Sequence, residues 1–99
     1  MPVYTIAHLK FKNIDAYRRY QNAFPAVFKK FNGTALAADE RPLLLEGEWT
    51  SDKVVVLSFP DEASALRFGN DPEYRAIAAD RRVGADATVL LVHGLESSR

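Results

Sequence analysis

The residues best suited to chemistry in this sequence are one histidine and one arginine. His8 lies in an apolar stretch, and because an imidazole titrates near neutral pH, His8 could act as a general acid or base. Arg81 could hold a ligand carboxylate through its planar guanidinium. We take both as candidate catalytic residues. The alternatives are a structural histidine inside a sheet and a cation that offsets the negative end of a helix.

Two aromatic residues and one carboxylate are candidate substrate-binding residues. Tyr74 precedes Arg81 by seven residues, which is two helical turns, so the two would share one helix face. Trp49 could form a pocket wall for a flat ligand, and Glu46 could act as a base. The aromatic residues could equally be packing residues. Glu46 could equally form an ordinary salt bridge with Arg81 or Lys53.

Several kinds of site lack the residues that they need. The chain has no cysteine, which excludes disulfides, thiol catalysis and cysteine-ligated metals. Its two histidines, His8 and His93, have no carboxylate at ligand spacing, and we expect His93 at the surface. Ser58 lacks a glycine-rich elbow, and no phosphate-binding glycine loop is present. We therefore predict neither a metal nor a bound cofactor.

Length and charge limit the class of protein further. The chain has 99 residues, and its 13 basic and 13 acidic residues give a formal net charge of zero. A nucleic-acid binder would show a basic excess, so we expect no nucleic-acid partner. No apolar run approaches the roughly 18 residues of a membrane span, and the N-terminal residues do not resemble a secretory signal. We expect a cytoplasmic protein with one domain over residues 1–95 and a disordered tail at 96–99.

Hydrophobic periodicity and turn residues predict the elements that position these side chains. The helix over 13–31 contains Pro25, which must kink it or start a second helix. Strand 43–49 should form a hairpin with strand 34–38. The predicted strands are 3–10, 34–38, 43–49, 53–59 and 85–93, and the predicted helices are 13–31, 61–69 and 71–84.

This order predicts an α+β fold, a ferredoxin-like split βαβ with an antiparallel sheet and helices on one face. The second sheet face would then be uncovered. The strands are nearly apolar at both alternating positions, as in Val54–Phe59, where only Ser58 is polar. An exposed apolar face of this kind is normally an interaction surface, so we predict a homodimer through the open sheet face.

Several short motifs lie along nearly the whole chain. They are Tyr4–Leu9, Asp15–Tyr17 followed by Tyr20, Leu45–Trp49, Val54–Pro60, Asp71–Arg75 and Arg81. In combination they resemble the motifs of the DUF1330 family, a family of unknown function. The resemblance implies the dimeric α+β barrel superfamily, which contains cofactor-free monooxygenases, lactone isomerases and haem-dependent relatives.

Two functions follow as hypotheses. The first is a cofactor-independent enzyme, of isomerase or monooxygenase type, acting on a small organic carboxylate or aromatic molecule. Its pocket would lie between sheet and helices, with His8 as base and Arg81 as anion anchor. The alternative is a non-catalytic small-molecule-binding or stress-associated dimer. A cavity that reaches His8 would favour the enzyme, and the enzyme hypothesis fails if His8 packs against neighbouring side chains with no cavity.

Overall fold

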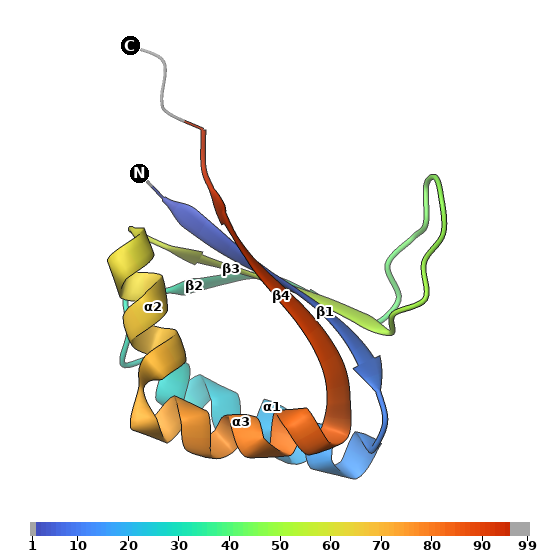
Figure 1. The fold of residues 1–99 in the computed structure, drawn as a ribbon, viewed down its shortest axis with the longest axis horizontal. Helices are drawn as coiled ribbons and strands as arrows, with labels where there is room; N and C mark the ends of the chain where they lie inside the picture. Colours follow the sequence, from blue (N-terminus) through green and yellow to red (C-terminus); the bar gives the residue numbers. More distant parts are fainter. Residues whose placement is uncertain (1, 96–99) are drawn as a thin grey trace.

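The computed structural model describes residues 2–95, in which four strands form one sheet and three helices cover one of its faces (Figure 1). The strand order is β2-β3-β1-β4, and every neighbouring pair is antiparallel. This is the predicted ferredoxin-like arrangement. The predicted tail at 96–99 lies outside the described residues. In chain order the elements are β1 (Val3–Phe11), α1 (Ile14–Phe28), β2 (Thr34–Asp39), β3 (Lys53–Phe59), α2 (Glu62–Asn70), α3 (Pro72–Gly84) and β4 (Ala85–His93).

The three helices begin where capping residues predict. Asn13, Asp61 and Asp71 each accept a hydrogen bond from the backbone N–H three residues later, at 3.1, 2.8 and 3.0 Å. These side chains satisfy N–H groups that the first helical turn leaves without a partner. Local chemistry therefore sets the helix starts, and through them the positions of Tyr74 and Arg81.

The end of the first helix differs from the prediction. α1 continues through Pro25 as a single helix, so no second helix starts there. It ends at Phe28 rather than Phe31, and the chain turns before β2. The turn brings Gly33 so close to Phe28 that a Cβ on the glycine would lie 2.6 Å from the ring. Residues 29–31, predicted as the last turn of the helix, thus belong to the turn that leads to β2.

The predicted strand at 43–49 is wrong. Residues 40–52 form an irregular connection, the arm, which projects beyond the end of the sheet (Figure 1). β2 pairs directly with β3, so the edge of β3 is already taken. A strand needs a neighbour for its backbone groups, and Pro42 together with Gly47, at φ 89°, further disfavours a regular one. Glu46 therefore lies in an irregular segment and not on a face of the sheet.

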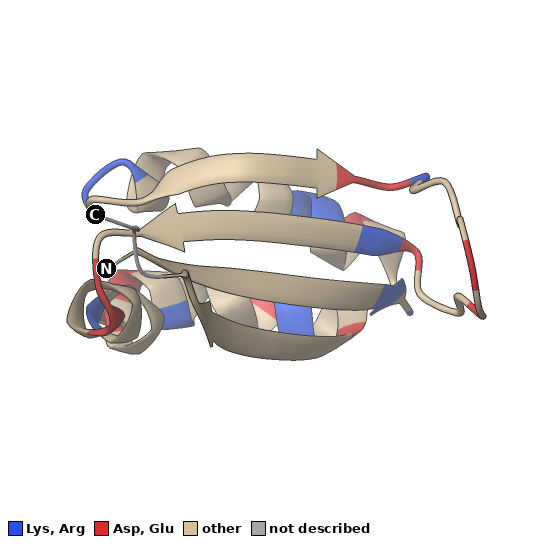
Figure 2. Ribbon diagram, turned by 90° about the horizontal axis from the view of Figure 1, so that it is seen from above, with Lys and Arg blue, Asp and Glu red and all other residues tan. Residues whose placement is uncertain are grey.

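The two faces of the sheet meet different surroundings. Thr5, Ala7 and Leu9 point toward the helices, whereas Ile6 lies on the opposite face. Its partners in the register there are Val56 and Leu90, and 52% of Leu90 is exposed. Figure 2 shows the middle of the strands without charged residues, which lie near the strand ends, in the arm and on the helices. One face thus builds the interior, and the other is apolar and uncovered in the protomer.

Helices α1 and α3 pack in close contact. A Cβ on Gly84 would lie 2.5 Å from the backbone nitrogen of Tyr17, so only glycine permits this approach. The carbonyl of Gly84 also accepts hydrogen bonds from the N–H groups of Lys12 and Asn13, at 2.7 and 3.1 Å. This contact sets the tyrosines of α1 opposite the side chains of α3. No helix among residues 2–95 is long and apolar enough to cross a membrane.

Candidate functional site

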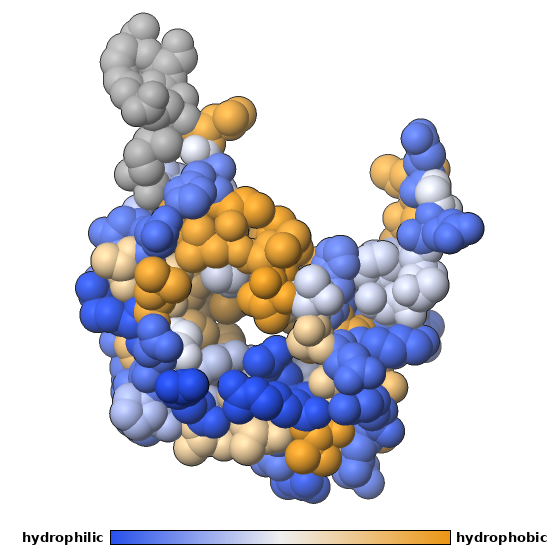
Figure 3. Space-filling model, in the orientation of Figure 1, coloured by the Kyte–Doolittle hydropathy of each residue, from blue (hydrophilic) through white to orange (hydrophobic). Residues whose placement is uncertain are grey.

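A cavity of about 430 Å³ lies between the helix-facing side of the sheet and helices α1 and α3. Figure 3 shows the molecule hollowed at this place, next to apolar residues coloured orange. Its volume is in the range of small-molecule sites. The walls are mostly aromatic and aliphatic. They include Ala7, Leu9, Tyr17, Tyr20, Phe24, Val55, Leu57, Phe68, Tyr74 and Val89.

The charged residues that line the cavity are all cations, namely Lys53, Arg81 and Arg82, and no aspartate or glutamate lines it. This imbalance is local, because the whole chain is neutral. Lys53 comes from the start of β3, and the two arginines come from the last turn of α3. The cavity wall is therefore electrostatically suited to a negative ligand.

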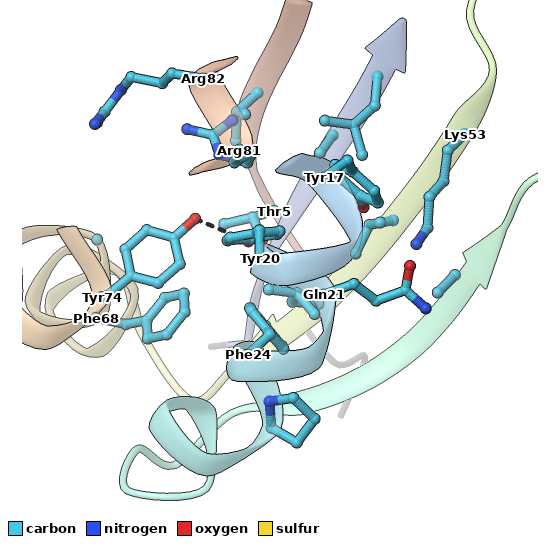
Figure 4. A pocket seen from close by; sticks show the side chains of 18 of the residues that line it. Thr5, Tyr17, Tyr20, Gln21, Phe24, Lys53, Phe68, Tyr74, Arg81 and Arg82 are labelled. Carbon is cyan, nitrogen blue, oxygen red and sulfur yellow. Dashed lines mark hydrogen bonds between the residues drawn. The ribbon is translucent and has the colours of Figure 1, made fainter. Parts of the chain in front are cut away.

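Two tyrosine hydroxyls meet at the cavity. Tyr20 on α1 and Tyr74 on α3 are hydrogen-bonded at 3.1 Å between their oxygens (Figure 4). Burial and the neighbouring Tyr74 raise the pKa of Tyr20 well above its ordinary value. Burial likewise raises the pKa of Tyr17 to about 12. The hydroxyls of Tyr20 and Tyr17 therefore stay protonated at neutral pH and do not act as bases.

Arg81 stands at the same end of the cavity as the hydroxyl pair (Figure 4). Its positive charge partly opposes the rise of the pKa of Tyr20 and of Tyr17. Its Nε atom is buried and has no hydrogen-bond partner among the described residues. Arg81 also forms no ion pair among residues 2–95, so the charge of its guanidinium is available to a negative group in the cavity that it lines.

Lys53 has a partner within the protein. Its side chain is only 6% exposed, and its Nζ lies 3.6 Å from Glu40 Oε2 and 4.8 Å from the ring centre of Tyr17. Burial lowers the pKa of Lys53, while Glu40 opposes that change. Glu40 also accepts two hydrogen bonds from Arg18, at 2.5 and 2.8 Å. The hydrogen bonds from Arg18 lower the pKa of Glu40 to about 2.

The structure places Arg81 and Tyr74 in the cavity as predicted, but it does not bring His8 there. His8 alternates with Ala7 and Leu9, so it points to the open face of the sheet, where it is exposed. There its ring lies 5.1 Å from that of Trp49, edge to face. The predicted pocket with His8 as base is therefore wrong, because strand alternation separates His8 from Arg81.

The remaining predicted residues lie outside the cavity. Trp49 and Glu46 both belong to the arm, and Glu46 is exposed. The carboxylate that pairs with Lys53 is Glu40, not Glu46. His93 is exposed, as expected, and its Nε2 lies 2.7 Å from Glu62. Among residues 2–95 no three potential metal ligands gather in one place.

Sequence reasoning missed Tyr20 and Lys53 as residues of the site. Tyr20 belongs to the apolar stripe of α1, which identifies a buried face but not an opening beside it. Lys53 could have been found from strand alternation, because it shares the parity of Val55 and Leu57. A lysine on the inner face of a strand needs either a partner or a ligand.

Comparison with known proteins assigns the family. A family model described as a domain of unknown function (DUF1330) matches residues 2–95. The chain belongs to the DUF1330 family. Among curated proteins, none matches this DUF1330 sequence.

Solved structures share the fold of this DUF1330 protein. A protein of unknown function from Rhodopseudomonas palustris has 19% identity and a TM-score of 0.80, with coverage of 97% of this chain and 84% of that one. SnoaB from Streptomyces nogalater, described as a cofactor-independent oxygenase, has 14% identity and a TM-score of 0.70, covering 97% and 95%. A protein from Jannaschia sp. CCS1, described as dimeric and ferredoxin-like, has 12% identity and a TM-score of 0.74, covering 95% and 100%. At these identities the likeness concerns the fold.

Proposed function

We propose that the protein is a homodimer in which each protomer binds a small organic molecule in the cavity. Conversion of that molecule without a cofactor, by isomerisation or oxygenation, would not use His8, which lies outside the cavity. The observation that carries this proposal is the aromatic cavity of about 430 Å³, which is lined by Arg81, a cation that forms no ion pair among residues 2–95. Apolar walls with a few polar groups aimed inward are typical of ligand sites. Arg81 and Tyr74 would contact the ligand, a small carboxylate or aromatic compound.

The fold supports chemistry of this kind by analogy. SnoaB has the same fold over 97% of this chain and is described as a cofactor-independent oxygenase. Fold likeness alone does not transfer an activity, because unrelated reactions occur on one fold. The cavity of the present chain must therefore be tested for itself.

The ligand is tested by native mass spectrometry of gently purified protein. We expect a dimer that carries a small additional mass, which extraction then identifies. Ala7→Phe would fill part of the cavity and remove that mass, whereas Ala76→Phe, on an exposed position of α3 outside the cavity, would retain it. An empty dimer, together with no binding of aromatic compounds to the wild type, would contradict the proposal.

The alternative function is binding without catalysis. One observation favours it: neither a histidine nor a carboxylate lines the cavity, so an ordinary general base is missing there. The two functions differ in the fate of the extracted ligand. The ligand, or its precursor, is incubated with the protein once with oxygen and once without it. An enzyme would convert the molecule, whereas a binding protein would return it unchanged.

The dimer would form through the open face of the sheet. This face is apolar at Ile6, Val56 and Leu90, and the similar protein from Jannaschia is described as dimeric. Pairing two such faces would remove the apolar surface from water. His8 and Trp49 lie on this side of the sheet, so in the dimer they would be near the interface and not at the ligand.

A matched pair of leucines tests the interface. Leu90 on the open face and Leu66 on α2 are 52% and 51% exposed. We expect Leu90→Asp to give a monomer in analytical ultracentrifugation, because it places a charge in the apolar contact. Leu66→Asp should leave the dimer intact. A dimer that persists in Leu90→Asp would place the interface elsewhere.

A further inference from the structure

We infer that the cavity selects an anion: a planar, largely apolar molecule whose acidic oxygen is bound by Arg81 and by the hydroxyl pair of Tyr20 and Tyr74. The acidic group would be a carboxylate or an enolate. This inference rests on the proposed function, because it names the class of molecule that the cavity takes. It also assigns a binding role to Tyr20.

The charge of the cavity wall favours an anionic ligand. Of its three cations, Lys53 meets the carboxylate of Glu40 at 3.6 Å. Arg82 is exposed, and Figure 4 shows it extending away from the tyrosine pair. Arg81 lines the cavity, is not fully exposed and makes no ion pair within residues 2–95. Its charge is therefore the one at this wall that a ligand can balance.

The hydroxyl pair also favours an anionic ligand. In the bond between Tyr20 and Tyr74 one hydroxyl donates and the other accepts, so one proton remains to be donated elsewhere. An anionic oxygen accepts hydrogen bonds only, and it would take that proton together with the N–H groups of Arg81. A neutral amide in the same place would bring its own donors to a site that already consists of donors.

The shape of the wall next to this end suits a flat molecule. Phe68 and Tyr74 lie 4.3 Å apart between ring centres, and Tyr20 and Phe24 lie 5.8 Å apart. These rings offer faces and edges against which an aromatic body can pack. The acidic group would then sit at Arg81, with the apolar body among the rings.

The test compares 2-naphthoate with 2-naphthamide, which share one ring system and differ in charge. Isothermal titration of the dimeric protein at neutral pH should show naphthoate binding about tenfold more tightly, as expected for a charge-assisted bond. Arg81→Gln should abolish this preference. Arg75→Gln, an equal charge change on an exposed position of the same helix outside the cavity, should keep it. Tyr20→Phe should reduce the preference several-fold.

Each outcome decides a separate point. Equal binding of the two probes that is lost in Ala7→Phe would overturn the anion inference and leave the proposed cavity function standing. No binding of either probe, together with no additional mass on the purified dimer, would overturn both. A preference that survives Arg81→Gln in a variant with wild-type circular dichroism would place the anion elsewhere. Should Arg81→Gln not fold, Arg81→Lys, which retains charge without the planar fork, must weaken naphthoate binding for the inference to stand.

Discussion

Lys53 and Arg81 both bring a positive charge to the wall of one cavity, but their surroundings differ. Lys53 lies 3.6 Å from Glu40 and over the ring of Tyr17, so its charge is balanced inside the protein. Arg81 has no carboxylate partner among the described residues, and its Nε makes no hydrogen bond there. A charge that is paired within the protein contributes to stability, whereas an unpaired charge is available to a ligand. Substitutions should therefore separate stability at Lys53 from binding at Arg81.

The largest effect on stability should come from Glu40→Gln. It removes the charge opposite Lys53 and leaves a buried ammonium without a counter-charge. The side chain of Glu40 is 34% exposed, and this tempers the loss. We expect the free energy of unfolding to fall by about 1–2 kcal/mol. Urea denaturation measures it, and a stability equal to wild type would show that Lys53 does not depend on Glu40.

Acid should weaken the same interaction. The hydrogen bonds from Arg18 lower the pKa of Glu40 from 4.5 to about 2, so its contribution to stability is complete above the ordinary value. That contribution is lost as the pH falls from 4.5 through about 2. The difference in unfolding free energy between wild type and Glu40→Gln should therefore shrink across this window. A difference that stays constant in urea titrations across it would contradict the assigned pKa.

Lys53→Met should have a smaller effect than Glu40→Gln. It removes the buried charge together with the cost of burying it, and Glu40 keeps its two bonds from Arg18. We expect a change of less than about 1 kcal/mol in either direction. A loss larger than that of Glu40→Gln would mean that the lysine stem, or its contact with Tyr17, stabilises more than the charge pair does.

The smallest effect on stability should come from Arg81→Gln. Arg81 loses only a favourable position near the carboxyl end of α3, which is worth about 0.5 kcal/mol. The unfolding free energy should stay within about that amount of wild type, although the preference for 2-naphthoate over 2-naphthamide is lost. A large loss of stability would show that Arg81 is a structural residue and would remove the contrast with Lys53.

Much of the fold was accessible from local patterns. Three helix starts are predicted by the capping residues Asn13, Asp61 and Asp71, and the structure confirms all three. Local patterns could not show that residues 43–49 form no strand. These residues are suited to a strand, but β2 already occupies the edge of β3 with which they would pair. Strand formation depends on what lies alongside, and a short window of sequence does not show this.

Only part of the candidate site could be predicted from the sequence. Arg81 and Tyr74 follow from helical spacing on one element, and both line the cavity. His8 was assigned to the wrong face, because an apolar stretch with no polar alternation does not show which parity is buried. Its neighbours Ala7 and Leu9 line the cavity instead.

The sequence by itself determined the helix starts and the position of Arg81 and Tyr74 on one helix face, because these depend on residues close together in the chain. It also determined the family, because the motifs are read without knowing how they meet in space. The tertiary structure decided which face of the sheet is covered, which carboxylate balances Lys53, and that the hydroxyls of Tyr20 and Tyr74 meet at 3.1 Å. These depend on the register between strands and on the packing of α1 against α3 at Gly84. Residues 54 positions apart in the chain meet there only because the whole sheet and its helices hold them.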